Sequence, residues 1–372
     1  MELPLADLEL VHALQIAPRA SWSQLAAALG RHPTTLAARW DRLRTDGRAW
    51  VTGHLGISGT QGCSTFIGVE CRPGRRSEVL ERLCAAAEIN TVEEAARAWD
   101  IRLTVLTRSW QQMARAVLPL VRADPAILRA QVNVVTRLYA TASNWRLDVL
   151  TPEQQRRVAT LRLETLRKRG ATPSRFGEMT AVLQRDGRAT AAEIARTTRT
   201  HPTTAARQLR QALETGLITL RCELAQEHSG YPVSCQWYVR VPPAQLEAAV
   251  RYLRSYRTLR LCASTTGDTN LTFQLWLRTP GDIFDVEAGL QTAAPGAQVV
   301  ESDVGVRTYK RMGWMLREDS TATGEVVVQP QGAGPQGTAS GQAAPERNDG
   351  AHQYGWPGSP HSYAATAART GP

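Results

Sequence analysis

The chain repeats itself at a spacing of 169 residues, which restricts it to folds built from two similar halves. His32-Pro33-Thr34-Thr35 recurs as His201-Pro202-Thr203-Thr204. In the same register, without gaps, further identities pair Leu14-Gln15 with Leu183-Gln184, Arg19-Ala20 with Arg188-Ala189, and Gly47 with Gly216. Matches in fixed register over about forty residues are hard to attribute to chance. We therefore expect two homologous modules, at about 1–143 and 175–316.

Each module opens with a pattern typical of a small three-helix domain. Leu10 and Leu14 lie at helical spacing on a first helix. Ser21-x-x-Gln24 and Thr190-x-x-Glu193 are capping boxes, which predict short second helices. Each third helix should begin at a proline, end at a glycine and lead into a wing strand. These are Pro33, Gly47 and Ala49–Leu55 in the first module, and Pro202, Gly216 and Leu217–Leu224 in the second.

The third helix is the one that indicates function. Leu36, Trp40 and Leu43 share one face and should contact the core. The opposite face carries hydroxyl groups at its start and Arg or Gln one turn later: Thr34, Thr35, Arg39 and Arg42, and in the second module Thr203, Thr204, Arg207, Gln208 and Gln211. Arg can pair with guanine, Gln with adenine, and Thr with phosphate or a thymine methyl group. We predict that both helices read DNA; the alternative is an ordinary solvated helix face.

The second half of each module predicts the order β-α-β-β-α-β. In the first module we expect strands Thr65–Glu70, Val92–Ala98, Ile101–Thr107 and Arg129–Thr141, with helices Arg75–Ala87 and Trp110–Arg122. In the second we expect strands Cys235–Val241, Leu259–Ser264, Leu271–Arg278 and Gln298–Tyr309, with helices Ala244–Ser255 and Ile283–Thr292. This order is the ferredoxin-like plan, whose helices cover one face of the sheet. The open face needs a partner, which predicts dimerisation.

The predicted fold class is α+β, with two tandem modules. Each module is a winged helix-turn-helix followed by a ferredoxin-like βαββαβ domain. The expected helix-turn-helix domains are 1–55 and 175–225, and the ferredoxin-like domains are 62–143 and 233–316. A basic, partly helical linker is expected at 144–174. Gly, Pro, Ala, Gln and Ser dominate 320–372, which predicts a disordered C-terminal tail.

Charge and cysteine content restrict the partners. The formal net charge is +10, which favours an anionic partner such as nucleic acid. The alternative is a general arginine bias, since only Lys168 and Lys310 are lysines. No apolar run approaches the length of a membrane span, which is about 18 residues. We expect no membrane association and a cytoplasmic, nucleoid-associated protein. The six cysteines form no C-x-x-C pair, so we expect no metal site.

In its two modules the chain resembles the Lrp/AsnC family of bacterial and archaeal regulators. Pro33-Thr34, Arg39, Leu43 and Gly47 fit the family's S-P-T-x-x-x-x-R-x-x-x-L-x-x-x-G recognition helix. In the second module Pro202-Thr203 and Gly216 match, whereas Gln208 stands at the Arg position. His32 and His201 replace the usual small hydroxyl cap. The resemblance implies a transcription regulator tuned by a small effector, often an amino acid.

The resemblance also suggests where such an effector would bind. Gly267-Asp268 matches the family's Gly-x-Asp-like hairpin, whereas the first module keeps only Asp100. We predict an effector site at Gly267, Asp268, Thr269 and Asn270, whose groups suit an amino acid. The alternative is a plain hairpin turn.

Family members typically use one module per chain and dimerise, so we predict that the two modules of this chain form an intrachain pseudo-dimer. Higher homo-oligomers are compatible with it. The expected partners are double-stranded DNA and an amino-acid effector.

Two other classes compete with a regulator. Proteins resembling the family decarboxylate siroheme, an activity expected to need histidines in the sensor half. None of the seven histidines falls in a predicted sensor strand or helix: His12, His32, His54, His201, His228, His352 and His361. We therefore predict no enzyme, no catalytic residues and no cofactor. The second alternative is an architectural protein that compacts DNA with little sequence preference.

Overall fold

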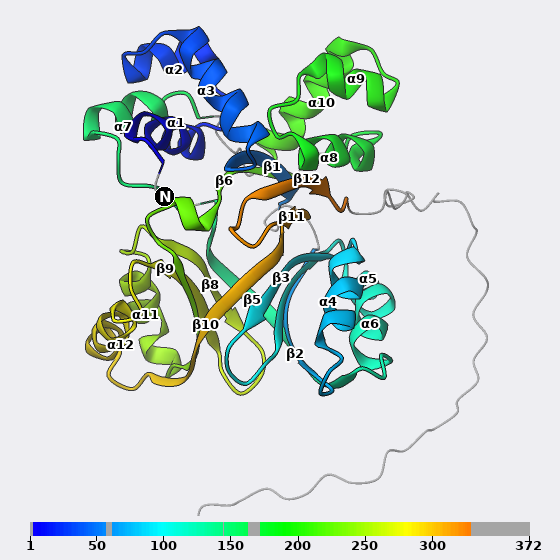
Figure 1. Ribbon diagram of the computed structural model, residues 1–372, viewed down its shortest axis with the longest axis vertical. Helices are drawn as coiled ribbons and strands as arrows, with labels where there is room; N and C mark the ends of the chain where they lie inside the picture. Colours follow the sequence, from blue (N-terminus) through cyan, green and yellow to red (C-terminus); the bar gives the residue numbers. More distant parts are fainter. Residues whose placement is uncertain (1–2, 57–61, 144, 163–171, 329–372) are drawn as a thin grey trace, which may run out of the picture. The chain divides into compact units, whose positions relative to one another are not determined.

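The computed structural model describes residues 3–56, 62–143, 145–162 and 172–328, which divide into two similar halves (Figure 1). Each half contains three helices, a connecting strand and a group of four strands with helices on its outer side. The predicted mixture of helices and strands is confirmed. The distal part of the predicted tail, including Tyr354 and Trp356, lies outside the described residues.

Each half begins with three short helices. They are α1 (Leu5–Ile16), α2 (Trp22–Leu29) and α3 (Pro33–Thr45) in the first half, and α8 (Phe176–Arg185), α9 (Ala191–Thr198) and α10 (Pro202–Glu214) in the second. Both predicted capping boxes form, at Ser21–Gln24 and Thr190–Glu193. Leu36, Trp40 and Leu43 of α3 are buried, as their spacing predicts.

The two predicted wing strands instead pair with each other. Strand β1 (Ala49–Leu55) runs antiparallel to β6 (Ile218–Leu224), from Ala49 opposite Leu224 to Leu55 opposite Ile218. The prediction that each helix-turn-helix is winged is therefore wrong. Each half supplies one strand, and the backbone donors and acceptors of that strand are satisfied by the other half. We call this two-stranded sheet the ribbon.

The remaining strands follow the predicted order closely. They are β2 (Cys63–Cys71), β3 (Ile89–Ala95), β4 (Ile101–Thr107) and β5 (Ile127–Thr141), and then β7 (Val233–Arg240), β8 (Leu259–Thr265), β9 (Leu271–Leu277) and β10 (Gln298–Arg311). Within each half the fourth strand lies beside the first, the first beside the third, and the third beside the second.

The eight strands close into a barrel because the two long last strands cross between the halves. The first part of β5 pairs with β2, and its second part, from Val135, pairs with β8. Likewise β10 pairs with β7 up to Val304 and with β3 from Gly305 onward. The structure thus joins the two sheets edge to edge, where packing of their open faces had been expected. Closure leaves none of the eight strands with an unpaired edge.

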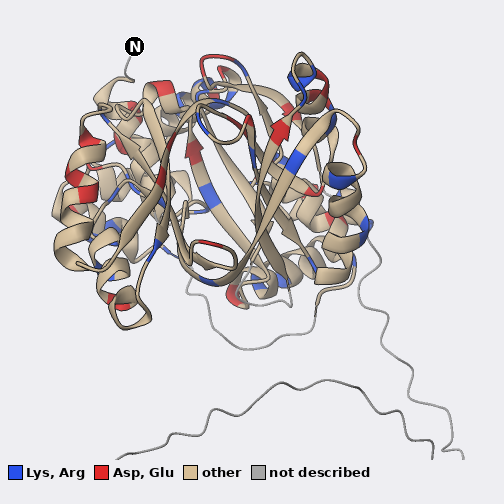
Figure 2. Cartoon of the chain, turned by 90° about the horizontal axis from the view of Figure 1, so that it is seen from below, with Lys and Arg blue, Asp and Glu red and all other residues tan. Residues whose placement is uncertain are grey.

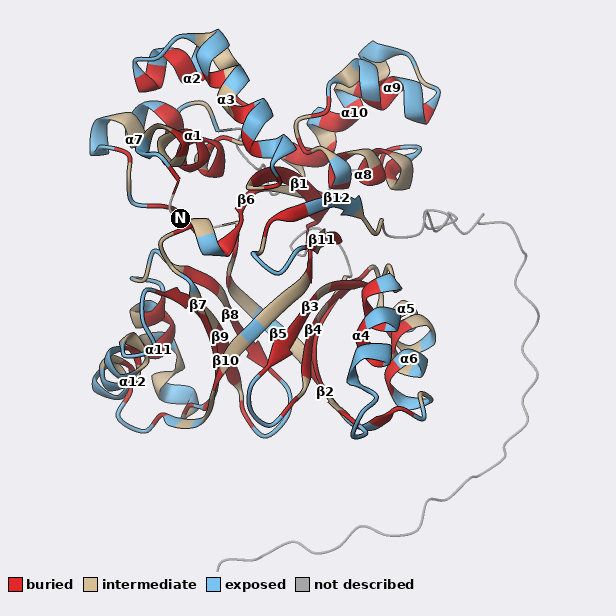
Figure 3. Ribbon diagram, viewed as in Figure 1, coloured by how far each residue is buried: buried red, intermediate tan, exposed pale blue. Residues whose placement is uncertain are grey.

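Helices cover the outside of the barrel. They are α4 (Arg76–Ala85), α5 (Trp110–Gln112) and α6 (Leu118–Arg122) in the first half, and α11 (Leu246–Leu253) and α12 (Asp282–Ala293) in the second. Their exposed faces point to solvent in Figure 3, and their buried faces pack on the strands in two separate apolar cores. The predicted helix Trp110–Arg122 is divided by a π-helical turn, Met113–Val117, just before Pro119. Proline has no N–H to donate, which disfavours a regular helix at that point.

Two strands follow β10 that the sequence did not predict. They are β11 (Trp314–Leu316) and β12 (Ala322–Val326), which form a hairpin against the ribbon end of the molecule. The Ala322 N–H donates to the Gly47 carbonyl at 2.7 Å, and the Trp314 ring packs on Trp50 with centroids 5.5 Å apart. The prediction that disorder begins at residue 320 is therefore wrong, because packing on the first helix-turn-helix orders 320–328.

The connecting segment contains one described helix, α7 (Pro152–Ala159), which packs on α1 and α2. The expected helical part of the linker is Gln154 to Lys168, and residues 163–171 of the predicted linker lie outside the described residues. Among the described helices, none is both long and apolar enough to cross a membrane.

Candidate DNA-binding surface and central cavity

Helix α3 presents most of its predicted DNA-reading side chains to solvent. Thr34, Thr35 and Arg42 are exposed. Arg39 is half-buried, because its Nη1 donates to Asp7 Oδ1 at 2.7 Å. Arg42 Nη2 lies 3.6 Å from the other oxygen of Asp7, yet its side chain remains 60% exposed. Arg42 is thus the more accessible of the two arginines.

Helix α10 differs from the prediction at one residue. Thr203 and Arg207 are exposed, and Thr204 and Gln211 are half-buried. Gln208 was expected to face outward, but it is buried and its Nε2 donates to Ser174 Oγ at 2.8 Å. That expectation is wrong, because the segment before α8 covers this part of the helix, a long-range contact that helical spacing does not reveal.

An arginine missed by the sequence reasoning, Arg210, is exposed on α10. It follows Arg207 by three residues, so the two lie on neighbouring turns of the helix. The spacing of three residues from Arg207 is the sequence signal that could have revealed Arg210.

Each of the two three-helix domains supplies an arginine that donates hydrogen bonds to backbone carbonyls of the other domain. Arg19 donates to the carbonyls of Gly187 and Ala189 at 2.6 and 2.8 Å. Arg188, its counterpart in the repeat, donates to the carbonyls of Pro18 and Ala20 at 2.7 and 2.9 Å. Together with the ribbon, these contacts hold α3 and α10 in one arrangement at the same end of the molecule (Figure 1).

The predicted effector hairpin is engaged in structural hydrogen bonds. Asn270 Oδ1 accepts from the Val241 N–H and its Nδ2 donates to the Val241 carbonyl, both at 2.8 Å. Thr269 is buried, whereas Gly267 and Asp268 are exposed. Gly267 has a φ of 110°, which a side chain would strain. Of this set, the Asp268 carboxylate is the group that remains open to solvent.

Asp100 is the counterpart of Asn270, whereas the sequence comparison had placed it opposite Asp268. Asp100 Oδ2 accepts from the Cys71 N–H at 2.7 Å, as Asn270 does from Val241. Both residues thus fasten the end of the first strand of their sheet. A spacing of 170 residues relates the two pairs, one more than in the helix-turn-helix domains.

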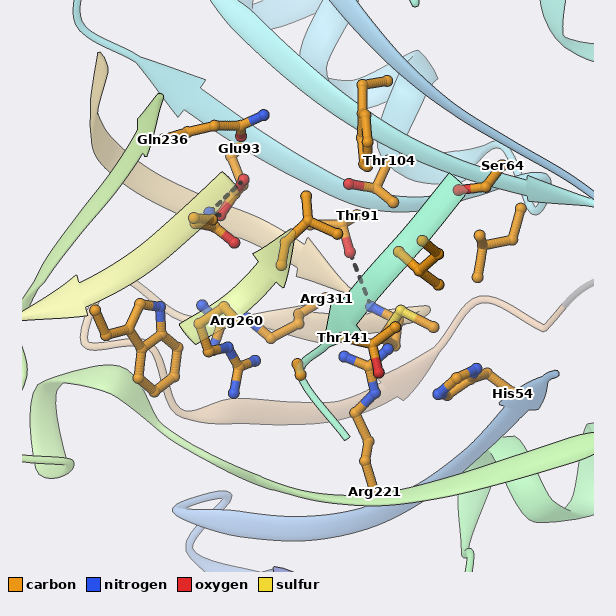
Figure 4. A pocket seen from close by; sticks show the side chains of 18 residues that line it. His54, Ser64, Thr91, Glu93, Thr104, Thr141, Arg221, Gln236, Arg260 and Arg311 are labelled. Atoms are coloured by element: carbon orange, nitrogen blue, oxygen red, sulfur yellow. Dashed lines mark hydrogen bonds between the residues drawn. The ribbon is translucent and has the colours of Figure 1, made fainter. Parts of the chain in front are cut away.

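A cavity of about 90 Å³ lies between the inside of the barrel and the ribbon. Figure 4 shows three arginines that reach it from different elements: Arg221 from β6, Arg260 from β8 and Arg311 from the end of β10. His54 of β1 also lines it. Hydroxyl and amide side chains complete much of the polar wall: Ser64, Thr91, Thr104, Thr141, Gln236 and Gln274.

A buried carboxylate holds two of these arginines. Glu223 accepts from Arg260 Nη2 at 2.8 Å and from Arg221 Nη1 at 3.1 Å. Burial alone would raise the pKa of Glu223, but Arg260 and Arg221 lower it to about 2. Burial lowers the pKa of Arg311 to about 10, so this guanidinium is still cationic at neutral pH. Arg260 also stacks on Trp276, with its guanidinium carbon 4.1 Å from the ring centroid.

His54 is the cavity residue that the sequence reasoning overlooked. Its side chain is buried, and burial together with the charge of Arg221 lowers its pKa to about 3. The imidazole is therefore neutral. Its position in the predicted wing strand, outside the sensor half, was the reason for setting it aside. The pairing of β1 with β6 brings it to the cavity.

Charged side chains are distributed over the barrel strands as well as the outer helices (Figure 2). Among the described residues, no group of three or more His, Cys, Asp or Glu side chains is arranged to hold a metal ion.

The comparisons with known proteins identify the first domain. Residues 6–44 match the AsnC-type helix-turn-helix domain. This part of the chain is therefore similar to the helix-turn-helix domains of AsnC-type regulators. No curated protein matches the sequence.

Solved structures match larger parts of the chain. The crystal structure of the siroheme decarboxylase NirDL covers 82% of this chain and 93% of its own, with 13% identity and a TM-score of 0.54. The same enzyme with an iron-uroporphyrin III analogue covers 83% and 93%, with 14% identity and a TM-score of 0.54. Escherichia coli AsnC covers 37% of this chain and 93% of its own, with 17% identity and a TM-score of 0.31.

The prediction that the chain is not an enzyme is overturned by these matches. An enzyme has the same fold over 82% of this chain, so the fold itself does not exclude catalysis. The argument from histidine positions also fails, because His54 lines the central cavity.

Proposed function

We propose that this protein is a sequence-specific transcription regulator of the Lrp/AsnC type, in which both recognition helices, α3 and α10, read a single DNA site. The observation that carries the proposal is the pairing of the two helix-turn-helix domains through the ribbon and the Arg19 and Arg188 contacts. Two reading helices in a fixed arrangement can engage two half-sites of one duplex.

In this proposal each half acts as one ferredoxin-like module, and the single chain replaces a dimer. The crossing of β5 and β10 between the halves supports this arrangement. The exposed side chains proposed to contact DNA are Thr34, Thr35 and Arg42 on α3 and Thr203, Arg207 and Arg210 on α10. Arg39, Thr204 and Gln211 are proposed as contacts from the partly covered edge of each surface.

Footprinting on the DNA upstream of the protein's own gene tests the proposal. We expect one protected site with two half-sites of different sequence, because α3 and α10 expose different side chains. Equal protection of random DNA would overturn sequence-specific regulation and favour an architectural role.

A second function is favoured by the cavity and the fold match. Arginines are the usual partners of carboxylates, and siroheme decarboxylase shares the fold. In this alternative the chain would decarboxylate a carboxylated substrate beside His54. The 90 Å³ cavity is far smaller than the about 300–1,000 Å³ of common ligand pockets, so a tetrapyrrole would require it to open. Incubation with siroheme, followed by mass spectrometry for loss of carbon dioxide, decides this alternative.

A further inference from the structure

We propose that helix α7 extends the DNA-binding surface of the first half, where Arg156 and Arg157 contact the phosphate backbone beside the half-site of α3. This inference rests on the proposed regulatory function, which places the DNA contacts on α3 and α10. Helix α7 lies on α1 and α2, at the end of the molecule that carries both recognition helices (Figure 1).

The sequence repeat shows which cations the first half lacks. In the second half, Arg196 of α9 and Arg199 in the turn before α10 are exposed. At the spacing of 169 residues their counterparts are Ala27 of α2 and Gly30, which are exposed but uncharged. The helix before a recognition helix crosses the DNA backbone, so cations on it suit phosphate contacts. Helix α2 contains no charged residue and offers no such contact.

Helix α7 brings two arginines to this position. Arg156 and Arg157 line a groove between α2 and α7 together with Ala27, the counterpart of Arg196. Both arginines are exposed. Arg157 pairs with Glu153 at 2.5 Å, whereas no carboxylate of the described residues lies within salt-bridge distance of Arg156. A DNA phosphate would supply an anion to Arg156 and compete with Glu153 for Arg157.

Helix α7 is anchored to the first helix-turn-helix. It begins with a capping box between Thr151 and Gln154, and Val158 is buried in the same apolar core as α1, α2 and α3. Just before the helix, the Leu150 N–H donates to Nδ1 of His12 on α1 at 3.2 Å. The backbone of α7 is thus ordered before DNA binds, which lowers the entropy cost of a contact.

Among the described residues, the second half has no counterpart of this helix. Trp145 recurs as Trp314 at the spacing of 169 residues, but the segments that follow differ. Pro152–Ala159 is helical, whereas the equivalent positions, 321–328, contain β12. The additional basic helix therefore lies on the half whose second helix has no cations. A general arginine bias does not account for this complementary distribution.

Protein variants combined with shortened duplexes test the proposal with the full chain. Arg156→Met together with Arg157→Met removes both charges but keeps side chains that can pack on α2. On a duplex with one helical turn of flanking DNA at each side, this double variant should bind roughly three- to tenfold more weakly. Its slope of log K against log salt concentration should be smaller by about one to two.

The duplex ends locate the contact. Removing the flank beside the α3 half-site, which Arg42→Ala identifies, should weaken the wild type and leave the double variant unaffected. Removing the flank beside the α10 half-site should weaken both proteins equally. The matched controls are Arg251→Met, exposed on α11, and the Lys variants of Arg156 and Arg157, which keep the charges and should retain the salt slope. Circular dichroism reports whether each variant folds.

The wild-type affinity and salt slope in the folded double Met variant, or an equal loss on all duplexes, would overturn the role of α7 and leave the proposed function intact. Equal binding of specific and random DNA by the wild type would overturn the proposed function. The salt slope on random DNA would still test α7, because phosphate contacts do not depend on sequence. Absence of any DNA binding would overturn both.

Discussion

At the scale of single residues, this protein depends on charges buried where the two halves meet. Glu223 is fully buried between Arg221 and Arg260, on a strand that belongs to the second half and pairs with the first. A buried carboxylate of this kind is tolerated because both oxygens accept charged hydrogen bonds. Removing its charge leaves two guanidinium groups without compensation.

Glu223→Gln should therefore lower the free energy of unfolding by about 3–5 kcal/mol. Glu153→Gln is the matched control, because Glu153 forms an exposed pair with Arg157 at 2.5 Å. An exposed helical pair contributes less than about 1 kcal/mol. Urea unfolding of both variants measures the difference, and similar losses would show that Glu223 has no special role.

A buried histidine gives the protein a predictable response to acid. His12 Nδ1 accepts from the Leu150 N–H at 3.2 Å, which requires a neutral ring. Burial, with the charge of Arg146, lowers the pKa of His12 from 6.5 to about 4. The unfolded chain therefore binds a proton at a higher pH than the folded one, so stability falls as pH decreases through this window.

His12→Gln removes this titration while keeping an acceptor. Between pH 6.5 and 4 the wild type should lose up to about 3 kcal/mol more than the variant. Unfolding free energies measured across that range check the expectation. Parallel pH curves for the two proteins would contradict it, and the titration of His54, common to both, cancels in the difference.

At the scale of elements, the recognition helices differ in how much of their surface is free. Arg42 on α3 and Arg207 on α10 are exposed, whereas Gln208 is covered and Arg39 is held by Asp7. The exposed arginines are therefore the ones whose loss should affect DNA most directly.

Arg42→Ala and Arg207→Ala should each weaken binding to the specific site by about 1–3 kcal/mol and relax preference at one half-site only. Fluorescence anisotropy with labelled duplexes mutated in either half-site measures both effects. Arg251→Ala, on α11, serves as the control and should bind like the wild type. Unaltered affinity in both recognition-helix variants would exclude these helices from DNA contact.

At the scale of the whole molecule, the halves complete each other. Without the second half, β3 would lose β10, the end of β5 would lose β8, and β1 would lose β6. Three unpaired edges in one fragment favour association, because backbone donors and acceptors seek partners.

A fragment of residues 1–174 should therefore form a homodimer that repeats the pairings of the intact chain. Sedimentation velocity gives its mass. Mixing it with a fragment of residues 175–372 should shift the population toward a heterodimer, because the cavity charges are divided between the halves. A folded, monomeric 1–174 fragment would show that each half is self-sufficient.

Local patterns in the chain were enough to place most elements. The capping boxes at Ser21 and Thr190 formed, and the strands Ala49–Leu55 and Ile101–Thr107 have the expected bounds. Such signals work because caps and periodicity depend on residues within a few positions of one another. The repeat also indicated two equivalent halves.

The remaining features of the fold and of the cavity depend on contacts between segments that are distant in the sequence. The partner of β1 lies in the other half, the cover over Gln208 comes from Ser174, and 320–328 are ordered by Gly47 and Trp50. The cavity likewise collects His54, Arg221, Arg260 and Arg311 from four strands and both halves. No local pattern marks these residues, because their common environment exists only once the barrel has closed against the ribbon. Burial in that environment makes their charges significant.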